Sequence, residues 1–182
     1  MNDQVYGHPH IALIGMMGSG KTSIGRLVAK YLDWPFLDAD SVLVEQVGCS
    51  ISDMFSDRGE QWFRDTESEV LAELAGAPVH SVLSVGGGAV LRQSNRDVLR
   101  RSALVIWLRA TPETLIQRIG SQPGRPLLAE DPEGRIRRLS EERTAIYNDG
   151  AHEVIDVDDL RMHQVAELIV AVYEAQPSLG NR

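Results

Sequence analysis

The 182-residue chain is short of cysteine, of long apolar runs and of basic charge, and each shortage excludes something. Its single cysteine, Cys49, excludes an internal disulfide and fits a reducing compartment. No apolar run approaches the roughly 20 residues that a membrane-spanning helix needs. The first ten residues, MNDQVYGHPH, lack the basic and apolar regions of a secretory signal. We therefore expect a cytoplasmic protein without membrane association.

Basic residues are outnumbered by acidic ones, 18 to 26, which gives a formal net charge of -8. Nonspecific nucleic-acid binding needs a basic face that displaces counterions from phosphates, so we expect no nucleic-acid partner. A small anionic substrate is still possible, because a few arginines inside a cleft can bind it locally. The charge thus restricts the partners more than the ligands.

What the chain does have is a regular alternation of apolar strands and amphipathic helices. The expected strands span residues 10–14, 35–38, 79–85, 103–108 and 153–156, and the expected helices span 20–32, 41–47, 51–56, 59–75 and 160–174. Such alternation indicates βαβ units and a parallel sheet. We expect an α/β fold with three α/β/α layers around a five-stranded parallel sheet, in a single domain covering residues 1–182 with a core at about 10–174.

One segment breaks this rhythm. Residues 120–134 (GSQPGRPLLAEDPEG) contain three prolines and three glycines with charges of both signs, which predicts a loop. Loops of this length are uncommon in compact domains and are usually functional. We expect a mobile lid at about residues 119–134.

The string GMMGSGKT, from Gly15 to Thr22, satisfies G-x-x-x-x-G-K-[ST] directly after a strand and directly before a helix. Glycines let successive backbone N–H groups turn inward toward phosphate oxygens, and the next helix adds its positive N-terminal end. Lys21 supplies a charge to the β- and γ-phosphates, and the Thr22 hydroxyl binds Mg²⁺. The motif predicts nucleoside triphosphate binding, but a GTPase or an AAA ATPase would share it.

Candidate acceptor residues lie where parallel strands should end, which is where open α/β sheets bind ligands. LDAD, residues 37–40, ends the second strand with two acids at i and i+2. One acid could help to hold magnesium while the other faces a substrate hydroxyl. Taken alone, Asp40 is better interpreted as the N-cap of the following helix, and for Asp38 the two interpretations are balanced.

Three further features are ambiguous when taken singly. Arg64 and Glu67, at i and i+3 on a helix, could form an inconsequential surface ion pair. Gly86–Gly88, after a buried strand, would let the backbone approach a ligand and offer N–H donors, or could be a flexible turn. Arg125 in the lid and Arg143 on the helix after it could reach a transferring phosphate or a substrate, or could be solvated charges.

Together these motifs resemble the shikimate kinase family, of the nucleoside monophosphate kinase-like fold. GMMGSGKT, LDAD, SISDMFSDRGEQWFRDTE, VLSVGGG, GRPLL and ERTAIY occur in the family's order and spacing, over residues 10–174. The resemblance implies transfer of the ATP γ-phosphate to the 3-hydroxyl of shikimate, on the route to chorismate and the aromatic amino acids. It implies Mg²⁺ as cofactor and shikimate and ATP as the small-molecule partners, and we expect a monomer.

The resemblance also implies roles for individual residues, with the substrate-binding helical region at about 40–75. Lys21, Asp40 and Arg125 would be catalytic, with Asp40 as the candidate base, and Thr22 and Asp38 would hold the metal, Asp38 through water. ATP would be bound by Gly15, Met17, Gly18, Ser19, Gly20, Lys21, Thr22, Ser23, Arg118 and Arg125. Shikimate would be bound by Asp40, Arg64, Gly86, Gly87, Gly88 and Arg143. Part of the 156–158 loop would accompany Arg118 at the adenine, and Phe55 and Phe63 would line the pocket or pack in the core.

One departure and two alternatives accompany this interpretation. The family usually has an acid four residues after the substrate-binding Asp, whereas here Val44 stands there and Glu45 follows. A gluconate or nucleoside monophosphate kinase would share the loop and lid, but residues 41–75 offer only Arg58 and Arg64 as basic groups for a nucleotide acceptor. A non-catalytic relative would be expected to lose Lys21, Asp40 or Arg125, and all three are present.

Overall fold

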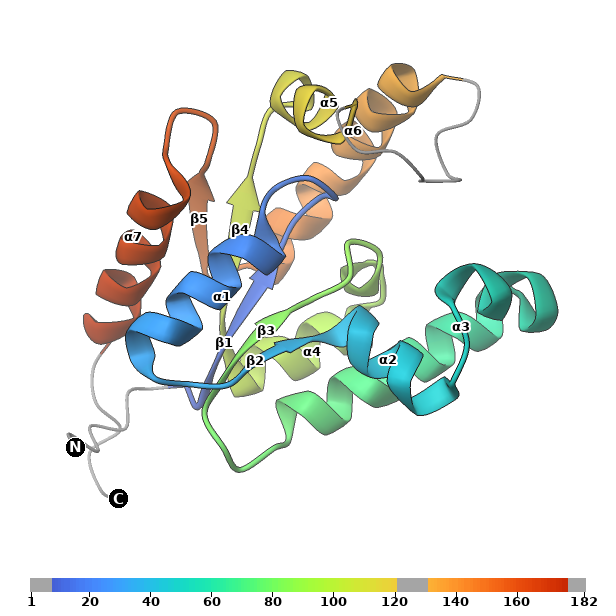
Figure 1. Cartoon of the computed structure of the whole chain (residues 1–182), viewed down its shortest axis with the longest axis horizontal. Helices are drawn as coiled ribbons and strands as arrows, with labels where there is room; N and C mark the ends of the chain where they lie inside the picture. The colour runs from blue at the N-terminus through green and yellow to red at the C-terminus, as the bar shows by residue number, and fades with distance from the viewer. Residues whose placement is uncertain (1–7, 121–130, 177–182) are drawn as a thin grey trace.

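The computed structural model describes residues 8–120 and 131–176, which form a sheet covered by helices on both faces (Figure 1). The strands are β1 (His10–Ile14), β2 (Phe36–Asp38), β3 (Ser81–Ser84), β4 (Ala103–Arg109) and β5 (Glu153–Asp156). The helices are α1 (Lys21–Leu32), α2 (Ala39–Val47), α3 (Ile51–Ala75), α4 (Gln93–Ser102), α5 (Pro112–Gly120), α6 (Pro132–Gly150) and α7 (Met162–Glu174), with a short 3₁₀ turn, η1 (Ala89–Leu91). Every expected strand is present.

The sheet has the strand order β2-β3-β1-β4-β5, and all its neighbouring strands pair in parallel. Strand β1 lies in the centre and is buried along its whole length, as its continuous apolar sequence predicts. Because all strands run the same way, their carboxyl ends meet at one edge of the molecule. The five-stranded parallel sheet expected from the sequence is confirmed.

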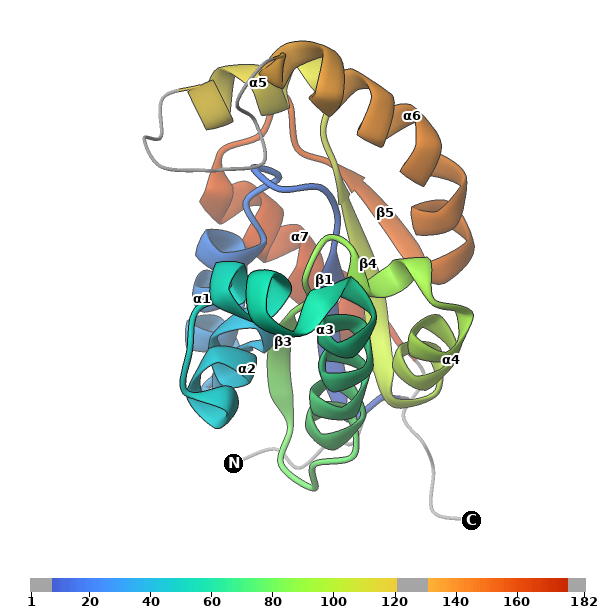
Figure 2. The same ribbon diagram turned by 90° about the vertical axis from the view of Figure 1, so that its right-hand side faces the viewer.

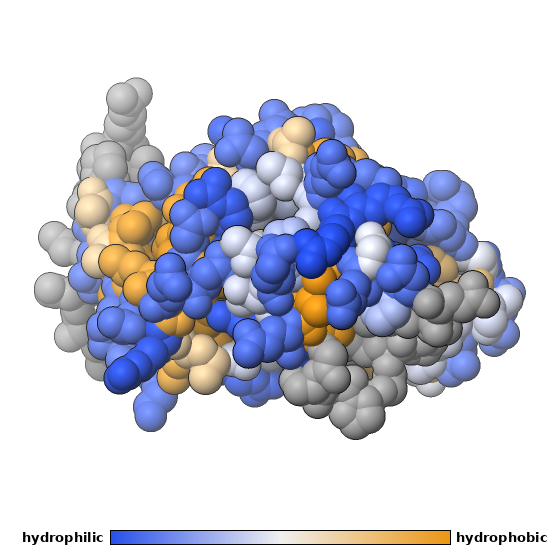
Figure 3. All heavy atoms as spheres, turned by 90° about the horizontal axis from the view of Figure 1, so that it is seen from above, coloured by the Kyte–Doolittle hydropathy of each residue, from blue (hydrophilic) through white to orange (hydrophobic). Residues whose placement is uncertain are grey.

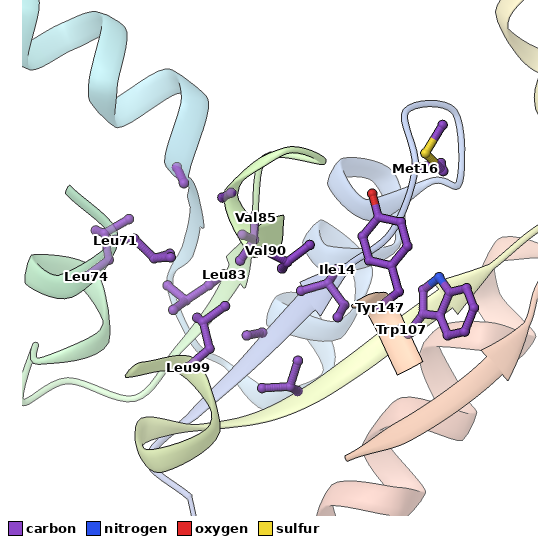
Figure 4. Close-up of a cluster of buried hydrophobic side chains, with 14 of the residues drawn as sticks. Ile14, Met16, Leu71, Leu74, Leu83, Val85, Val90, Leu99, Trp107 and Tyr147 are labelled. Atoms are coloured by element: carbon purple, nitrogen blue, oxygen red, sulfur yellow. The ribbon is translucent and has the colours of Figure 1, made fainter. Parts of the chain in front are cut away.

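The two faces of the sheet are covered by different helices. Helices α1 and α7 pack on one face, and α3, α4 and α6 lie on the other (Figure 1, Figure 2). Each face has its own apolar core, and the core on the α3–α4–α6 side is shown in Figure 4. This core continues from Leu71 on α3 to Met16 in the loop after β1, so the packing extends up to the loop. The three-layer prediction is confirmed.

The segment expected to be loop, residues 120–134, is helical at both of its ends. Helix α5 continues to Gly120 and α6 begins at Pro132, while residues 121–130 lie outside the described part of the chain. Asp131 caps α6 by accepting a hydrogen bond from the Gly134 N–H at 3.0 Å, and Pro132 occupies the first turn, where its missing N–H costs nothing. The prediction that Gly134 belongs to the loop was therefore wrong.

The N-cap of α2 is Asp38, whereas Asp40 was the better candidate from the sequence alone. The Asp38 carboxylate accepts from the Ser41 N–H at 3.4 Å, and Asp40 lies inside the first helical turn. The helix begins two residues earlier than the apolar pattern indicated, which turns Asp40 away from the capping position. Asp40 is thereby left available to the neighbouring cavity.

The two expected helices at 51–56 and 59–75 join into α3 with a kink at Gly59, whose φ of 81° and ψ of 168° are not helical. This backbone region is essentially restricted to glycine. Within the described residues, no helix is both long and apolar enough to cross a bilayer.

Candidate active site

The carboxyl end of the sheet collects the loops that follow β1, β2 and β3. Seen from this side, the surface is mostly hydrophilic (Figure 3). A cavity of about 660 Å³ opens here, and a second cavity of about 420 Å³ lies on the other side of the loop after β1. The larger cavity is lined by ten of the site residues predicted from the sequence: Met17, Lys21, Thr22, Asp38, Asp40, Arg64, Gly86, Gly87, Gly88 and Arg143.

The loop between β1 and α1 has a backbone that only glycine adopts easily. Gly15, Gly18 and Gly20 have φ values of 142°, 82° and 98°, where L-residues are strained. A Cβ on Gly15 would lie 2.7 Å from the Leu108 carbonyl oxygen. The loop is thus held tightly against β4, with its amides leading into the N-terminus of α1, which is the arrangement that binds phosphates.

Two side chains at the start of α1 point into the larger cavity. The Lys21 ammonium donates to the carbonyl oxygens of Gly15 at 2.9 Å and Met16 at 3.0 Å, so it is held over the loop. The Thr22 hydroxyl donates to Asp38 Oδ2 at 3.0 Å. A hydroxyl and a carboxylate side by side are hard oxygen donors of the kind that Mg²⁺ prefers together with substrate phosphates. These residues therefore fit a magnesium–phosphate group.

Asp40 is an acid that lines the larger cavity next to Asp38. Burial raises the pKa of its carboxyl, and the nearby charge of Asp38 raises the pKa further, while Lys21 and Arg64 oppose both effects. A Cβ on Gly86 would lie 2.7 Å from Asp40 Oδ1, so the glycine turn contacts the carboxylate directly. A half-buried carboxylate between an acid and two cations can accept a hydrogen bond, and a proton, from a bound hydroxyl.

Arg64 and Glu67 form a partly buried ion pair and not the inconsequential surface pair considered above. Their Nη1 and Oε2 atoms are 2.7 Å apart, and Glu67 is only 6% exposed. The Arg64 guanidinium also lies over the ring of Phe63 at 5.0 Å and over that of Phe55 at 5.9 Å. Phe63 is a core residue, while Phe55 also lines the cavity. The guanidinium is therefore held in one place, at the cavity wall.

The triple glycine after β3 lies between the arginines and the phosphate-binding loop. A Cβ on Gly88 would lie 2.7 Å from Arg64 Nη1, and a Cβ on Gly87 would lie 3.3 Å from the Gly15 carbonyl oxygen. Arg143 Nη1 donates to the Gly87 carbonyl at 3.2 Å. A side chain at Gly88 would displace the Arg64 guanidinium, so glycine at this position leaves the arginine in place at the cavity wall.

Five of the remaining nucleotide candidates line the smaller cavity. Arg118 is present there with Gly18, Ser19, Gly20 and Ser23, and its Nη2 donates to the Val157 carbonyl at 3.0 Å. The loop at 156–158 contributes Val157 to this cavity, while the carboxylates of Asp156 and Asp158 bind Arg109 and the Thr111 N–H instead. Gly15 is on neither lining. Arg125 lies outside the described residues.

The cavity also contains residues that sequence reasoning assigned no role. Arg135, Ile136 and Leu139 on α6 line it, and Tyr147 lies on the same helix beneath the glycine turn. Arg135, Ile136 and Leu139 precede Arg143 by eight, seven and four residues, and Tyr147 follows it by four. Helical spacing from Arg143 would have placed them on the same face. Val44 and Glu45, the departure noted above, are exposed on α2 and do not line the cavity.

The fold and this edge of the sheet define a P-loop phosphotransferase, in which a phosphate-binding loop and an acceptor cavity share a wall. The model of the family described as shikimate kinase matches residues 17–174. The chain belongs to the shikimate kinase family, whose members are kinases that use ATP to phosphorylate shikimate.

Individual relatives support this membership. A shikimate kinase from Symbiobacterium thermophilum is 44% identical over 169 residues, covering 91% of this chain and 97% of its own. A shikimate kinase from Thermodesulfovibrio yellowstonii is 41% identical over 166 residues, covering 91% of this chain and 95% of its own. Among solved structures, a shikimate kinase from Acinetobacter baumannii in complex with shikimate has a TM-score of 0.85 at 35% identity, covering 92% of this chain and 93% of that chain.

Proposed function

We propose that this chain transfers the γ-phosphate of ATP to the 3-hydroxyl of shikimate, giving shikimate 3-phosphate and ADP. The observation that carries the proposal is the shared cavity. Lys21 and Thr22 of the phosphate-binding loop line the same space as Asp40, Arg64 and Arg143. Phosphoryl transfer is mostly positioning and charge neutralisation, so a donor and an acceptor site in one cavity supply the main requirement.

On the donor side, the loop amides and Lys21 hold the phosphates, and Thr22 with Asp38 holds Mg²⁺, Asp38 through water. When bound, the ion neutralises charge on the transferring phosphoryl group. Arg118 and the 156–158 loop bind the adenine from the smaller cavity. Arg125, with the lid, reaches the transferring phosphoryl group and excludes water as the lid closes.

On the acceptor side, Arg64 and Arg143 bind the carboxylate of shikimate, because a planar guanidinium donates two parallel hydrogen bonds to such a group. The amides of Gly86–Gly88 add donors beside them. Asp40 accepts from the shikimate hydroxyls, orients the attacking oxygen and takes its proton as the bond to phosphorus forms. The ion pair with Glu67 and the rings below keep Arg64 ready before the substrate arrives.

The direct test is a panel of acceptors. Purified protein with MgATP is given shikimate, gluconate or AMP, and ADP release is followed. We expect turnover that depends on shikimate alone. Turnover with gluconate or AMP would reassign the acceptor. No turnover with any of them, in protein that binds ATP, would favour a non-catalytic relative.

Two further features belong to the same proposal. We place the protein in the cytoplasm, on the support of its single cysteine, and regard it as a monomer. Sedimentation analysis of the active protein would measure the mass directly. A species of twice the 20.1 kDa chain mass at working concentration would contradict the monomer.

A further inference from the structure

Tyr147 is a buried side chain behind the wall of the larger cavity. It does not line this cavity itself, but it bonds the backbone of Gly87, which does. It lies on α6, one turn after Arg143, and is 1% exposed. Its ring stacks on Trp107 of β4 at a centroid distance of 5.6 Å, and Figure 4 shows its hydroxyl pointing away from that ring. The hydroxyl donates to the Gly87 carbonyl at 2.7 Å, shorter than the 3.2 Å bond from Arg143 to the same oxygen.

Two donors on one carbonyl determine the orientation of the whole peptide. The unit between Gly87 and Gly88 is planar, and its C=O and N–H point in opposite directions. Fixing the Gly87 oxygen toward α6 therefore fixes the Gly88 N–H on the opposite side of the peptide. Within the described residues, the Gly88 N–H donates to no acceptor. Glycines do not hold such an orientation by themselves, because their φ and ψ are the least restricted.

We propose that Tyr147 is a positioning residue for acceptor binding: its hydroxyl, with Arg143, fixes the Gly87–Gly88 peptide so that the Gly88 N–H is presented to the substrate carboxylate. This role rests on the proposed function. It explains why a polar group is buried at the base of the turn, where phenylalanine would fill the same volume.

The residues packed around Tyr147 hold its side chain in a fixed position relative to the sheet. Trp107 pairs with Ile14 in the sheet, directly before the phosphate-binding loop, and Gly87 lies close to the Gly15 carbonyl. The phenol thus places the glycine turn relative to the strand that carries the donor site. Burial raises the pKa of Tyr147 to about 12, so the hydroxyl keeps its proton and its direction as a donor over the working range of pH.

The experiment compares two tyrosine variants that each lose one buried hydroxyl. Tyr147→Phe is the test, and Tyr173→Phe is the matched control, since Tyr173 is also 1% exposed and donates to a backbone carbonyl, that of His8, on the other face of the sheet. We expect Tyr147→Phe to raise KM for shikimate about five- to tenfold, the size of one lost buried hydrogen bond, with kcat and KM for ATP within about twofold of wild type. Tyr173→Phe should leave all three constants unchanged.

A second readout is independent of the acceptor. In ¹⁵N-glycine-labelled protein without ligands, we expect the Gly88 amide resonance to shift and broaden in Tyr147→Phe and to stay in place in Tyr173→Phe. An unchanged Gly88 resonance, or an unchanged KM for shikimate in a variant that merely melts earlier, would overturn the positioning role. If the wild-type protein does not turn over shikimate, the proposed function fails, and the resonance still decides the role of Tyr147.

Discussion

The environment that suits Asp40 to its proposed role as a base also lowers the stability of the folded protein. Its carboxyl is half-buried beside Asp38, and both the partial burial and the neighbouring charge raise its pKa. In the unfolded chain the carboxyl is free of them, so folding makes the charged form less favourable. The protein therefore gives up stability at neutral pH while it keeps a charged acid at the proposed acceptor site.

Asp40→Asn is expected to lower kcat by on the order of 10²- to 10⁴-fold, because the amide cannot take the proton of the acceptor hydroxyl. It is also expected to raise the melting temperature. Because the folded-state pKa lies above the unfolded value, the loss of stability is complete above the folded pKa and absent below the unfolded one. The thermal advantage of the variant should thus be present at pH 8 and vanish toward pH 3.5.

Glu45→Gln is the matched control for this change, since Glu45 is an exposed acid on the same helix outside the cavity. It should alter neither kcat nor the melting temperature. A fall in kcat in Glu45→Gln would show that the acid next to Val44 takes part in the reaction. If Asp40→Asn melted at a lower temperature than wild type at pH 8, this would contradict the loss of stability assigned to the Asp40 charge.

Arg64 has a structural role and a proposed role in substrate binding, and two variants separate them. Arg64→Ala should raise KM for shikimate by roughly 100-fold with little change for ATP, as expected for loss of a charged bidentate contact. It should also lower the free energy of unfolding by about 3 kcal/mol, because Glu67 is left buried without its partner. Arg64→Ala combined with Glu67→Ala should regain most of that stability and none of the shikimate affinity.

Kinetics and urea denaturation of wild type and the two variants would test this separation. Recovery of KM in the double variant would mean that Arg64 acts on the substrate only through Glu67. Equal stabilities of the single and double variants would mean that the buried carboxylate costs nothing when unpaired.

At the scale of elements, the phosphate-binding loop depends on its contact with α5. Gly18 has a φ of 82°, and a Cβ there would lie 2.9 Å from Ile119. Gly18→Ala should cost roughly 1–2 kcal/mol of backbone strain and should also weaken ATP binding by shifting the loop. Gly48→Ala, at a φ of 79° with open space around it at the end of α2, should cost similar stability and leave ATP affinity unchanged. Calorimetric titration with ATP would distinguish the two, and equal affinities would contradict the coupling of loop and helix.

The elements also show where prediction from the sequence stops. Continuous apolar runs located β1 and β4, because strands buried on both faces leave no other pattern. The first turn of α6, near Gly134, was assigned to the loop, because proline and glycine are typical of loops. The hydrogen bond by which Asp131 caps the helix could not be recognised from that composition. Helix α4 was not foreseen, as its ten residues are mostly polar and only Asn95 and Leu99 are buried.

The residues of the candidate site also divide into those that the sequence could predict and those that it could not. The loop at 15–22 could be predicted because the motif is contiguous. Arg64 looked inconsequential, because its burial against Glu67 and the two phenylalanine rings depends on how α3 packs. Tyr147 acts on a carbonyl 60 residues away, a contact that only the folded sheet creates.

In the molecule as a whole, the two ends of the sheet carry different kinds of titratable side chain. The carboxyl end carries the acids and arginines of the cavity, whereas the amino end carries His8, His10 and His152. His10 is fully buried and bonds Ser81 through Nδ1 at 2.8 Å, and His8 stacks on His152 at 5.0 Å. Burial lowers the pKa of His8 and His10. We therefore expect the loss of stability on mild acidification to arise mainly at the end of the sheet remote from the cavity, while Asp40 acts in the opposite sense.

His152 allows this separation to be tested. Its backbone N–H donates to the Val105 carbonyl at 2.8 Å, and its Nδ1 accepts from the Val105 N–H at 3.0 Å, so the ring takes the place of a strand neighbour. Burial, with the charge of Arg100, lowers the pKa of His152 to about 4 from its ordinary 6.5. The unfolded chain therefore binds the proton first, and stability is lost as pH falls from about 6.5 toward 4. Protonation of Nδ1 also removes the acceptor for Val105.

His152→Gln keeps an acceptor within reach but cannot titrate, and His163→Gln removes an exposed histidine of α7 as the control. Melting temperatures between pH 7.5 and 4.5 should fall less steeply in His152→Gln than in wild type, and equally steeply in His163→Gln. The slope should not vanish, because His8 and His10 remain. The pH profile of kcat/KM should be the same in all three proteins, since Asp40 lies at the opposite end of the sheet. Equal melting slopes in wild type and His152→Gln would remove His152 from the acid response, and a shifted activity profile would mean that the two ends are coupled through β4.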